Sequence, residues 1–329
     1  MSSGMYLVKD LDAKDIVREP IRFGFGKGLV EAGRRNENIV ALCADLTGST
    51  KMDGFAKEFP ERFVQTGIQE QNLTLVSAGM AAMGKIPFCT SYAAFHPGRS
   101  FDQIRTMVCM NQWPVKIIGS HAGVSVGPDG GTHQMLEDIA MMRALPNMVV
   151  VAPGDSIEAE KATIALAEDA RPAYMRLARE PTPVFTSQRT PFSLNRAFVL
   201  SPGTDVSIIA TGSMTYQALL ASERLYKEGI DAEVVHVPVI KPLDTMTLLR
   251  SLEKTGAVVT VEEAQIIGGL GGAIAEFAGE HKPVPVKRIG IRDRFGESGE
   301  PDELLVKFHL TAKDIAAQVH ELMIEMGRE

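Results

Sequence analysis

Cysteine is scarce in this sequence. Its 329 residues include only three cysteines, and none of them belongs to a paired metal-ligand spacing. An odd number of cysteines in apolar segments argues against a disulfide framework and against a zinc site, so no metal ligands are expected in this chain. We therefore expect Cys43, Cys89 and Cys109 to be reduced, buried thiols of a cytoplasmic protein.

An excess of basic charge and long apolar runs are also lacking. The formal net charge is −7, and Lys and Arg do not gather in a run, which argues against nucleic acid as a partner. No apolar run approaches the length needed to cross a membrane, so no membrane association is expected. Residues 1–6 resemble neither a secretory signal nor a transit peptide, which again favours the cytoplasm.

What the chain does contain is a regular alternation of strand-like and helix-like segments. The run 38–45 is almost continuously apolar, which is typical of a strand buried on both faces. Gly33 is predicted to end the first helix, and Ser156 is predicted to cap a later one. In this half of the chain we expect further strands at 86–89, 115–120, 148–152 and 173–177, and helices at 23–32, 73–83, 99–110, 134–144 and 156–168.

A second series of strands and helices follows a stretch rich in Pro, Thr, Ser and Arg, residues 179–203, which predicts a linker. The glycines of 268–273 lack the dinucleotide fingerprint spacing, so they indicate a tight turn between strand and helix. Strands that alternate with helices favour mostly parallel sheets. We predict the α/β fold class, with two doubly wound domains at 1–188 and 189–329.

The stretch 64–73 places a carboxylate, Glu70, where a strand-like run gives way to a helix. The six residues after Glu70 include no Lys or Arg that could neutralise it. Two explanations stay open from this stretch alone. Glu70 is either a charge at a helix N-terminus or a group that shares a proton with a bound molecule.

Polar residues follow each of five predicted strands, where ligands of parallel sheets collect. The most distinctive set is a glycine-rich loop in which Asp129 and His133 lie four residues apart, a pattern that indicates a backbone laid close against a ligand. The five sets are 45–49, Glu70, 91–96, 120–134 and 176–179.

Several of these motifs together resemble the pyrimidine-binding domain of transketolase. They are Thr-Gly-Ile-Gln-Glu-Gln-Asn at 66–72, 91–105 and the Gly-Ser-His to Thr-His-Gln segment at 119–134. The resemblance continues at 136–147 and 152–156, and in the second domain at 262–272 and 293–299. It covers nearly the whole chain. It implies a thiamine-diphosphate pyrimidine-binding domain followed by a transketolase-type C-terminal α/β domain.

One departure from the family has a clear implication. A full transketolase begins with a pyrophosphate-binding domain whose Gly-Asp-Gly motif holds the metal ion and the diphosphate, and this sequence contains no Gly-Asp-Gly. The resemblance therefore implies the C-terminal subunit of a split transketolase, which transfers a two-carbon ketol unit between sugar phosphates. A separate N-terminal subunit would share the thiamine diphosphate and bind Mg²⁺ or Ca²⁺. A homodimer, and a heterotetramer with that partner, are expected.

The resemblance also implies roles for residues around the cofactor. Glu70 would hydrogen-bond the pyrimidine ring nitrogen and exchange a proton with it. Asp45 would contact the cofactor or the neighbouring loop. Tyr92 and Phe95 would stack on the pyrimidine, although core packing is an equal explanation for Phe95 alone.

For the sugar phosphate, the matching positions fall into two groups. Arg22, Ser49 and Arg179 would bind the phosphate, because Arg forks pair well with phosphate oxygens. His121, Asp129 and His133 would bind hydroxyl groups, and the two histidines would take part in proton transfer. The segment 96–99 is one residue longer than in transketolases, which leaves the roles of His96 and Arg99 open.

Three other readings compete. The beta chain of a 2-oxo acid dehydrogenase has a similar length and plan, but a His-His-Ser-type loop is expected there instead of Asp129 to His133. A deoxyxylulose-phosphate synthase fragment shares the Gly-Thr-His-Gln element, but 119–125 is more similar to transketolase. A non-catalytic oligomerisation or regulatory module would have no chemical need for Glu70 and the polar loop.

Overall fold

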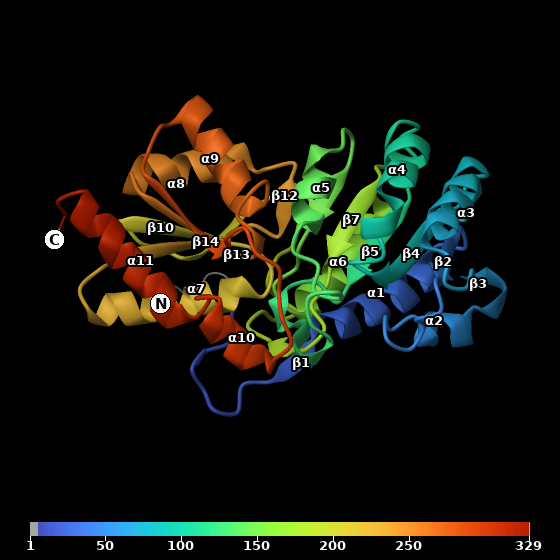
Figure 1. Cartoon of the computed structure of the whole chain (residues 1–329), viewed down its shortest axis with the longest axis horizontal. Helices are drawn as coiled ribbons and strands as arrows, with labels where there is room; N and C mark the ends of the chain where they lie inside the picture. Colours follow the sequence, from blue (N-terminus) through green and yellow to red (C-terminus); the bar gives the residue numbers. More distant parts are fainter. Residues whose placement is uncertain (1–5, 329) are drawn as a thin grey trace.

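The computed structural model describes residues 6–328, which form two α/β units side by side (Figure 1). The first contains a seven-stranded sheet with the strand order β12-β6-β7-β5-β4-β2-β3, and the second a five-stranded sheet with the order β14-β13-β10-β11-β9. In each unit, helices cover both faces of the sheet. The predicted fold class, α/β with mostly parallel sheets, is confirmed.

The strands of the first sheet run parallel, apart from β12 at its edge. All five residues of β2 are buried, as its apolar sequence predicts. The strands of this sheet are β2 (Ile39–Cys43), β3 (Phe63–Gln65), β4 (Ile86–Tyr92), β5 (Lys116–Ser120), β6 (Val149–Val151), β7 (Ala173–Arg176) and β12 (Val239–Lys241). The helical segments around it are α1 (Ile21–Arg35), α2 (Asp53–Glu58), η2 (Pro60–Arg62), α3 (Glu70–Ala82), η3 (Gly98–Ser100), α4 (Phe101–Gln103), η4 (Ile104–Cys109), η5 (Val124–Asp129), α5 (Asp138–Ala144) and α6 (Ser156–Glu168).

The second sheet has a parallel centre and one antiparallel edge strand, β9. Its strands are β9 (Phe198–Ser201), β10 (Val206–Ala210), β11 (Ala232–His236), β13 (Val258–Gln265) and β14 (Val286–Ile291). The helices around it are α7 (Met214–Lys227), α8 (Thr245–Thr255), α9 (Leu270–His281), α10 (Pro301–Lys307) and α11 (Ala312–Glu325). Thr311 caps α11 in a capping box with Asp314.

The predicted linker at 179–203 is wrong in part, because it contains two strands. β8 (Pro181–Pro183) pairs antiparallel with β1 (Arg18–Pro20), and β9 joins the second sheet. The sequence hides β8 because two of its three residues are prolines, which cannot donate to a ladder and occur only at sheet edges.

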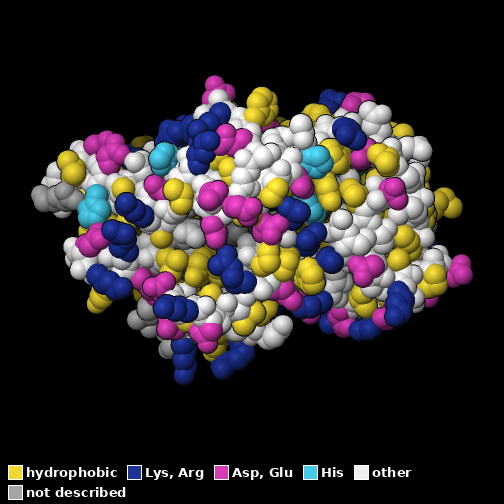
Figure 2. Space-filling view, turned by 60° about the horizontal axis from the view of Figure 1, so that its bottom comes forward, with side chains coloured by type: hydrophobic (Ala, Val, Ile, Leu, Met, Phe, Trp, Pro, Cys, Tyr) yellow, Lys and Arg dark blue, Asp and Glu magenta, His cyan; other side chains and the backbone are white. Residues whose placement is uncertain are grey.

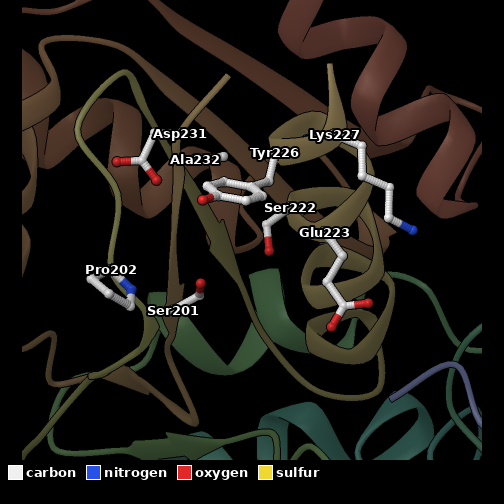
Figure 3. A pocket seen from close by; sticks show the side chains of 8 residues that line it. All are labelled: Ser201, Pro202, Ser222, Glu223, Tyr226, Lys227, Asp231 and Ala232. Carbon is white, nitrogen blue, oxygen red and sulfur yellow. The ribbon is translucent and has the colours of Figure 1, made fainter. Parts of the chain in front are cut away.

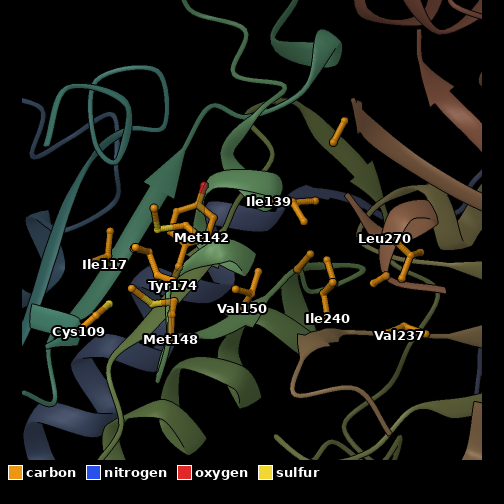
Figure 4. Packing of buried hydrophobic residues seen from close by; sticks show 14 of the residues in the cluster. Cys109, Ile117, Ile139, Met142, Met148, Val150, Tyr174, Val237, Ile240 and Leu270 are labelled. Atoms are coloured by element: carbon orange, nitrogen blue, oxygen red, sulfur yellow. The ribbon is translucent and has the colours of Figure 1, made fainter. Parts of the chain in front are cut away.

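The two units also share structure. β12 lies in the second half of the sequence but pairs with β6 of the first sheet. One hydrophobic cluster continues across both units, from Ile117 and Val150 to Val237 and Leu270 (Figure 4). The domain boundary that we predict at residue 188 stays a proposal. The chain enters the second sheet at β9 and later returns to the first sheet at β12.

Two predicted helix ends are wrong. α1 continues past Gly33 to Arg35, and Gly33 is buried. A Cβ on Gly33 would lie 2.6 Å from the Phe55 ring, so this glycine permits a close contact instead of ending the helix. The cap of α6 is Asp155, not Ser156, because Asp155 Oδ1 accepts a hydrogen bond from the Glu158 amide at 2.9 Å.

Two predicted helices are also shorter or less regular than expected. The helix predicted at 134–144 begins only at Asp138. Gln134 lies before it, and its side-chain amide donates to the carbonyl oxygens of Val124, Gly127 and Glu297. The helix predicted at 99–110 is a succession of a 3₁₀ turn, a short α-helix and a π-helix.

The prediction that the three cysteines are buried, reduced thiols agrees with the structure. Cys43, Cys89 and Cys109 are buried free thiols. Burial raises the pKa of Cys89 to about 12 and that of Cys109 to about 11. Among the described residues no helix is long and apolar enough to cross a membrane. On the face in Figure 2, acidic and basic side chains are interspersed.

Candidate active site

Five strands of the first sheet are parallel neighbours, so their carboxyl ends lie side by side along one end of the sheet. They are β2, β3, β4, β5 and β7. The segments that follow these strands carry the polar residues singled out in the sequence. Such an end is where open α/β sheets bind their ligands. It is the candidate active site.

Glu70 is the first residue of α3 and is 5% exposed. Gly67, with a φ of 73°, makes the turn that leads into this helix. Both carboxylate oxygens of Glu70 accept from Arg99 Nη1 at 3.3 Å. Sequence reasoning missed this ion pair, because its cation lies 29 residues away in the chain. Glu70 therefore lies at a helix N-terminus and also carries a charged partner.

Aromatic rings line the site next to Glu70. Tyr92 stacks on the His121 ring with centroids 3.7 Å apart, and on the Phe95 ring at 5.8 Å. Phe95 also meets the edge of His133 at 5.2 Å and carries the Arg99 guanidinium over its face at 4.2 Å. Phe95 is half-buried among polar partners and lies outside the buried hydrophobic clusters.

His121 is held in a strained and dry position. Its φ is 59°, which is uncommon for a residue with a side chain, and it is 1% exposed. Its Nδ1 lies 2.9 Å from Ser120 Oγ and its Nε2 lies 3.4 Å from Arg22 Nη1. Burial, then the charges of Arg22 and Arg179, lower the pKa of His121 to about 3. The ring is therefore neutral near pH 7.

Two arginines from distant elements lie near His121. Arg22, at the start of α1, donates to the Ser49 carbonyl at 2.6 Å, so Ser49 contributes its backbone and not its hydroxyl. Arg179 donates to the Val126 carbonyl at 2.7 Å and forms an ion pair with Glu180 at 3.0 Å. Burial and the nearby Arg179 charge lower the pKa of Arg22. The arginines therefore bring positive charge to one side of the site.

The glycine-rich loop passes between the site and the second unit. Asp129 is exposed and lies 4.0 Å from Arg179, whereas His133 is half-buried against the rings. Gly127 and Gly130 have φ values of 80° and 73°, which only glycine adopts readily. A Cβ on Gly130 would lie 2.5 Å from Ser298 Oγ, so the loop packs closely on the second unit.

The second unit also holds this loop through a buried carboxylate that sequence reasoning missed. Glu263, at 3% exposure, accepts from the Ser125 amide at 2.6 Å. Burial raises its pKa, and the charge of Arg176 opposes that rise. Arg176 donates to the Glu263 carbonyl at 2.8 Å and to Asp138 at 2.9 Å. No local signal in the sequence links residue 125 to residue 263.

The remaining candidates lie at the margin of the site or inside the protein. Asp45 is exposed with a φ of 58°, and its amide donates to Gln65 Oε1 at 2.7 Å. His96, whose role the sequence left open, is fully buried behind the site. It lies 2.7 Å from Ser100 Oγ and 3.4 Å from Cys89 Sγ. Burial lowers the pKa of His96 to about 3, so it is a neutral interior residue.

Residues 6–328 contain no group of three or more His, Cys, Asp or Glu side chains that could hold a metal ion. A separate hollow lies in the second unit, where the ends of β9 and α7 meet the start of β11 (Figure 3). Tyr226, Lys227 and Glu223 line it, and none of them belongs to the candidate site.

Comparison with known proteins places this geometry in a family. The pattern of the transketolase pyrimidine-binding domain matches residues 20–184, and that of the transketolase C-terminal domain matches residues 195–315. Among solved structures, a split-gene transketolase described as an inactive beta4 tetramer superimposes with a TM-score of 0.87. It is 46% identical, and the match covers 93% of this chain and 98% of that one.

Two further relatives are transketolase subunits. A 6-deoxy-6-sulfo-D-fructose transketolase subunit of Clostridium sp. is 45% identical, over 89% of this chain and 91% of that protein. An apulose-4-phosphate transketolase subunit of Phocaeicola vulgatus is 37% identical, over 92% of this chain and 97% of that protein.

The fold and the matched patterns define a protein with a pyrimidine-binding domain and a C-terminal α/β domain. The chain belongs to the transketolase family. This family depends on thiamine diphosphate.

Proposed function

We propose that this chain supplies the pyrimidine half of a thiamine-diphosphate site and most of the channel for a ketose. With its partner it transfers a two-carbon ketol unit between sugar phosphates. The observation that carries the proposal is the position of Glu70. Glu70 is a nearly buried carboxylate at a helix start, and its partner Arg99 lies over the face of Phe95, whose ring also meets His133. A carboxylate next to an aromatic face matches the requirements of an aminopyrimidine.

The residues present fit that ring. Glu70 offers carboxylate oxygens to a ring nitrogen, Phe95 offers an aromatic face, and Tyr92 extends the aromatic wall. Ser91, at the end of β4, has a buried hydroxyl without a partner in the described part of the chain, which leaves a polar atom for a ligand. When bound, thiamine diphosphate would supply the nucleophilic carbon for the ketose carbonyl. Glu70 would hold and return a proton at the ring nitrogen, and Asp45 would support the neighbouring loop.

For the substrate, we propose that the arginines bind the phosphate and the histidines bind the hydroxyl groups. Arg22 and Arg179 come from opposite ends of the sequence of the first domain, and the Ser49 carbonyl holds the Arg22 guanidinium in place. His121 is neutral, so it can exchange a hydrogen bond with a hydroxyl without adding charge. His133 and the exposed Asp129 stand at the mouth and complete the hydroxyl contacts.

A partner chain is part of the proposal. An N-terminal transketolase subunit would bind the diphosphate and Mg²⁺ or Ca²⁺, and this chain would form a homodimer or, with the partner, a heterotetramer. The solved relative that consists of beta chains alone is described as inactive, which supports a need for a second subunit. Adjacent segments beside Glu70 expose large apolar side chains that a partner would cover. They are Ile68, Leu75, Met83, Met107 and Met110.

The proposal is tested by purifying this chain with the proteins that accompany it in its source cells. The complex is assayed for ketol transfer from xylulose 5-phosphate with and without thiamine diphosphate and Mg²⁺. Glu70→Ala should abolish turnover while the fold and the assembly persist, because the variant loses the carboxylate that would exchange a proton with the ring nitrogen. Near-normal turnover of this variant would refute the mechanism. A lipoyl-linked partner would point to a 2-oxo acid dehydrogenase, and no activity with any partner would favour a non-catalytic module.

A further inference from the structure

Arg99 contacts both of the groups that we assign to the cofactor's pyrimidine ring. Its Nη1 lies 3.3 Å from each oxygen of Glu70, and its guanidinium carbon lies 4.2 Å from the centroid of Phe95. In the part of the chain that the structure describes, no other side chain donates to the Glu70 carboxylate. The Arg99 guanidinium therefore pairs with the Glu70 carboxylate and covers the face of the Phe95 ring at the same time.

The guanidinium is a chemical stand-in for an aminopyrimidine. Both groups are planar and delocalised, both present N–H donors at their edge, and both can lie over an aromatic face. The Glu70 side chain is only 6% exposed, so little of it remains for a second ligand while Arg99 is in place. The ring and the guanidinium cannot both hold these contacts.

The contact is also easily broken. A charge-assisted hydrogen bond normally measures about 2.7–2.9 Å, and here one nitrogen serves both oxygens at 3.3 Å, without the two parallel bonds of a bidentate pair. The Arg99 side chain is 52% exposed and can swing into solvent. Its backbone is fixed, because the neighbouring Ser100 is anchored to His96 at 2.7 Å and the Arg99 carbonyl accepts from Gln71.

We propose that Arg99 closes the pyrimidine site of the cofactor-free chain and must leave Glu70 before the ring can enter. The contact is autoinhibitory, and it keeps the carboxylate paired until the cofactor arrives. This inference rests on the proposed function, because it takes Glu70 and Phe95 as the pyrimidine contacts.

The test measures binding with the full chain. Isothermal titration is carried out with thiamine diphosphate and, separately, with 4-amino-5-hydroxymethyl-2-methylpyrimidine. Arg99→Ala should bind both about tenfold more tightly than the unchanged chain, the size expected when an exposed ion pair and a cation–π contact no longer compete. Unchanged or weaker binding, or no binding by the variant, would overturn the proposal, since an arginine that assists the cofactor predicts the opposite sign.

Arg105→Ala is the matched control. Arg105 is exposed on η4, six positions further along, and its removal changes the net charge by the same amount. It should leave both affinities unchanged. A gain in both variants would assign the effect to net charge and refute a specific contact. Thermal unfolding of both variants shows whether the fold is kept.

A second readout asks whether the gain depends on Glu70. In a Glu70→Gln background, Arg99 loses its ion pair, so Arg99→Ala should improve binding of the pyrimidine fragment by clearly less than it does when Glu70 is present. An equal gain in affinity in both backgrounds would contradict the proposed autoinhibitory contact between Arg99 and Glu70. The turnover assay of Glu70→Ala is separate. If that variant is inactive and Arg99→Ala does not bind more tightly, only the inference about Arg99 fails.

Discussion

At the scale of single residues, two histidines are neutral, His121 in the candidate site and His96 buried behind it. Burial is the main cause that lowers the pKa of His96 and His121 to about 3, from the ordinary value of 6.5. Neither ring carries charge at neutral pH, so the positive charge beside the aromatic wall comes from arginine. The same shift has a consequence for stability, because in the unfolded chain both rings regain their ordinary pKa.

We predict that the protein loses stability as the pH falls from about 6.5 towards 3. In that window the unfolded chain binds protons at His96 and His121 and the folded chain does not, so acid favours unfolding. Each histidine contributes a slope of about 1.4 kcal/mol per pH unit. Urea unfolding of His96→Asn at pH 7 and pH 5 should show a smaller loss between the two pH values than the unchanged chain. Equal losses would mean that His96 titrates normally in the folded state.

At the scale of elements, two helices meet through glycine. α1 carries Arg22 to the site and packs on α6. A Cβ on Gly24 would lie 1.8 Å from the Ser156 carbonyl oxygen, and one on Gly28 would lie 2.7 Å from the Glu160 carbonyl oxygen. The backbones of the two helices therefore approach more closely than any side chain would allow.

Gly24→Ala should consequently destabilise the protein, by about 2 kcal/mol or more, because the methyl group must push α1 away from α6. Gly79→Ala on α3 is the control. Apart from the adjacent residues and the backbone of α3 itself, no described atom lies within 4 Å of a Cβ there, so alanine should stabilise this chain by about 0.5–1 kcal/mol through helix propensity. Urea unfolding measures both. A neutral Gly24→Ala would show that the two helices separate without cost.

The helices and strands also show which parts of the fold can be predicted from the sequence. The central strands were predictable, because β2 and its neighbours are apolar runs between turn residues. The strand β8 was not predictable, since its prolines suggest a linker. The prediction that Gly33 ends the first helix was wrong, because glycine is favoured both at helix ends and at close contacts between elements. At the candidate site, the local sequence predicted that Glu70 lies where a helix begins, and the structure has it there. Its partner Arg99 was not predicted, because an ion pair between residues far apart leaves no periodic pattern.

At the scale of the whole molecule, the second unit reaches into the site of the first. Glu263 holds the Ser125 amide, and Gln134 donates to the Glu297 carbonyl at 2.9 Å. The loop that carries Asp129 and His133 is thus fixed from outside its own domain. This arrangement gives the second unit a positioning role, although the described residues that line the proposed site belong to the first unit.

We predict that Glu263→Ala loosens this loop. The Ser125 amide would lose its acceptor, at a local cost of about 1–3 kcal/mol. Hydrogen exchange of residues 124–129 should accelerate while that of β2 stays unchanged, and KM should rise in the assembled enzyme. Glu263→Gln keeps an acceptor oxygen and should preserve most of the protection. Equal acceleration in both variants would show that this oxygen does not hold the loop.

The position of strand β12 limits where the sequences of two relatives can be joined in a chimera. Residues 239–241 lie beyond residue 188, yet they close the edge of the first sheet beside β6. A chimera joined at the linker would inherit the first sheet from one parent and its last strand from the other. The unit of inheritance for the first sheet is therefore discontinuous in the gene, and crossovers should succeed only where both parents carry compatible sequences at β6 and β12.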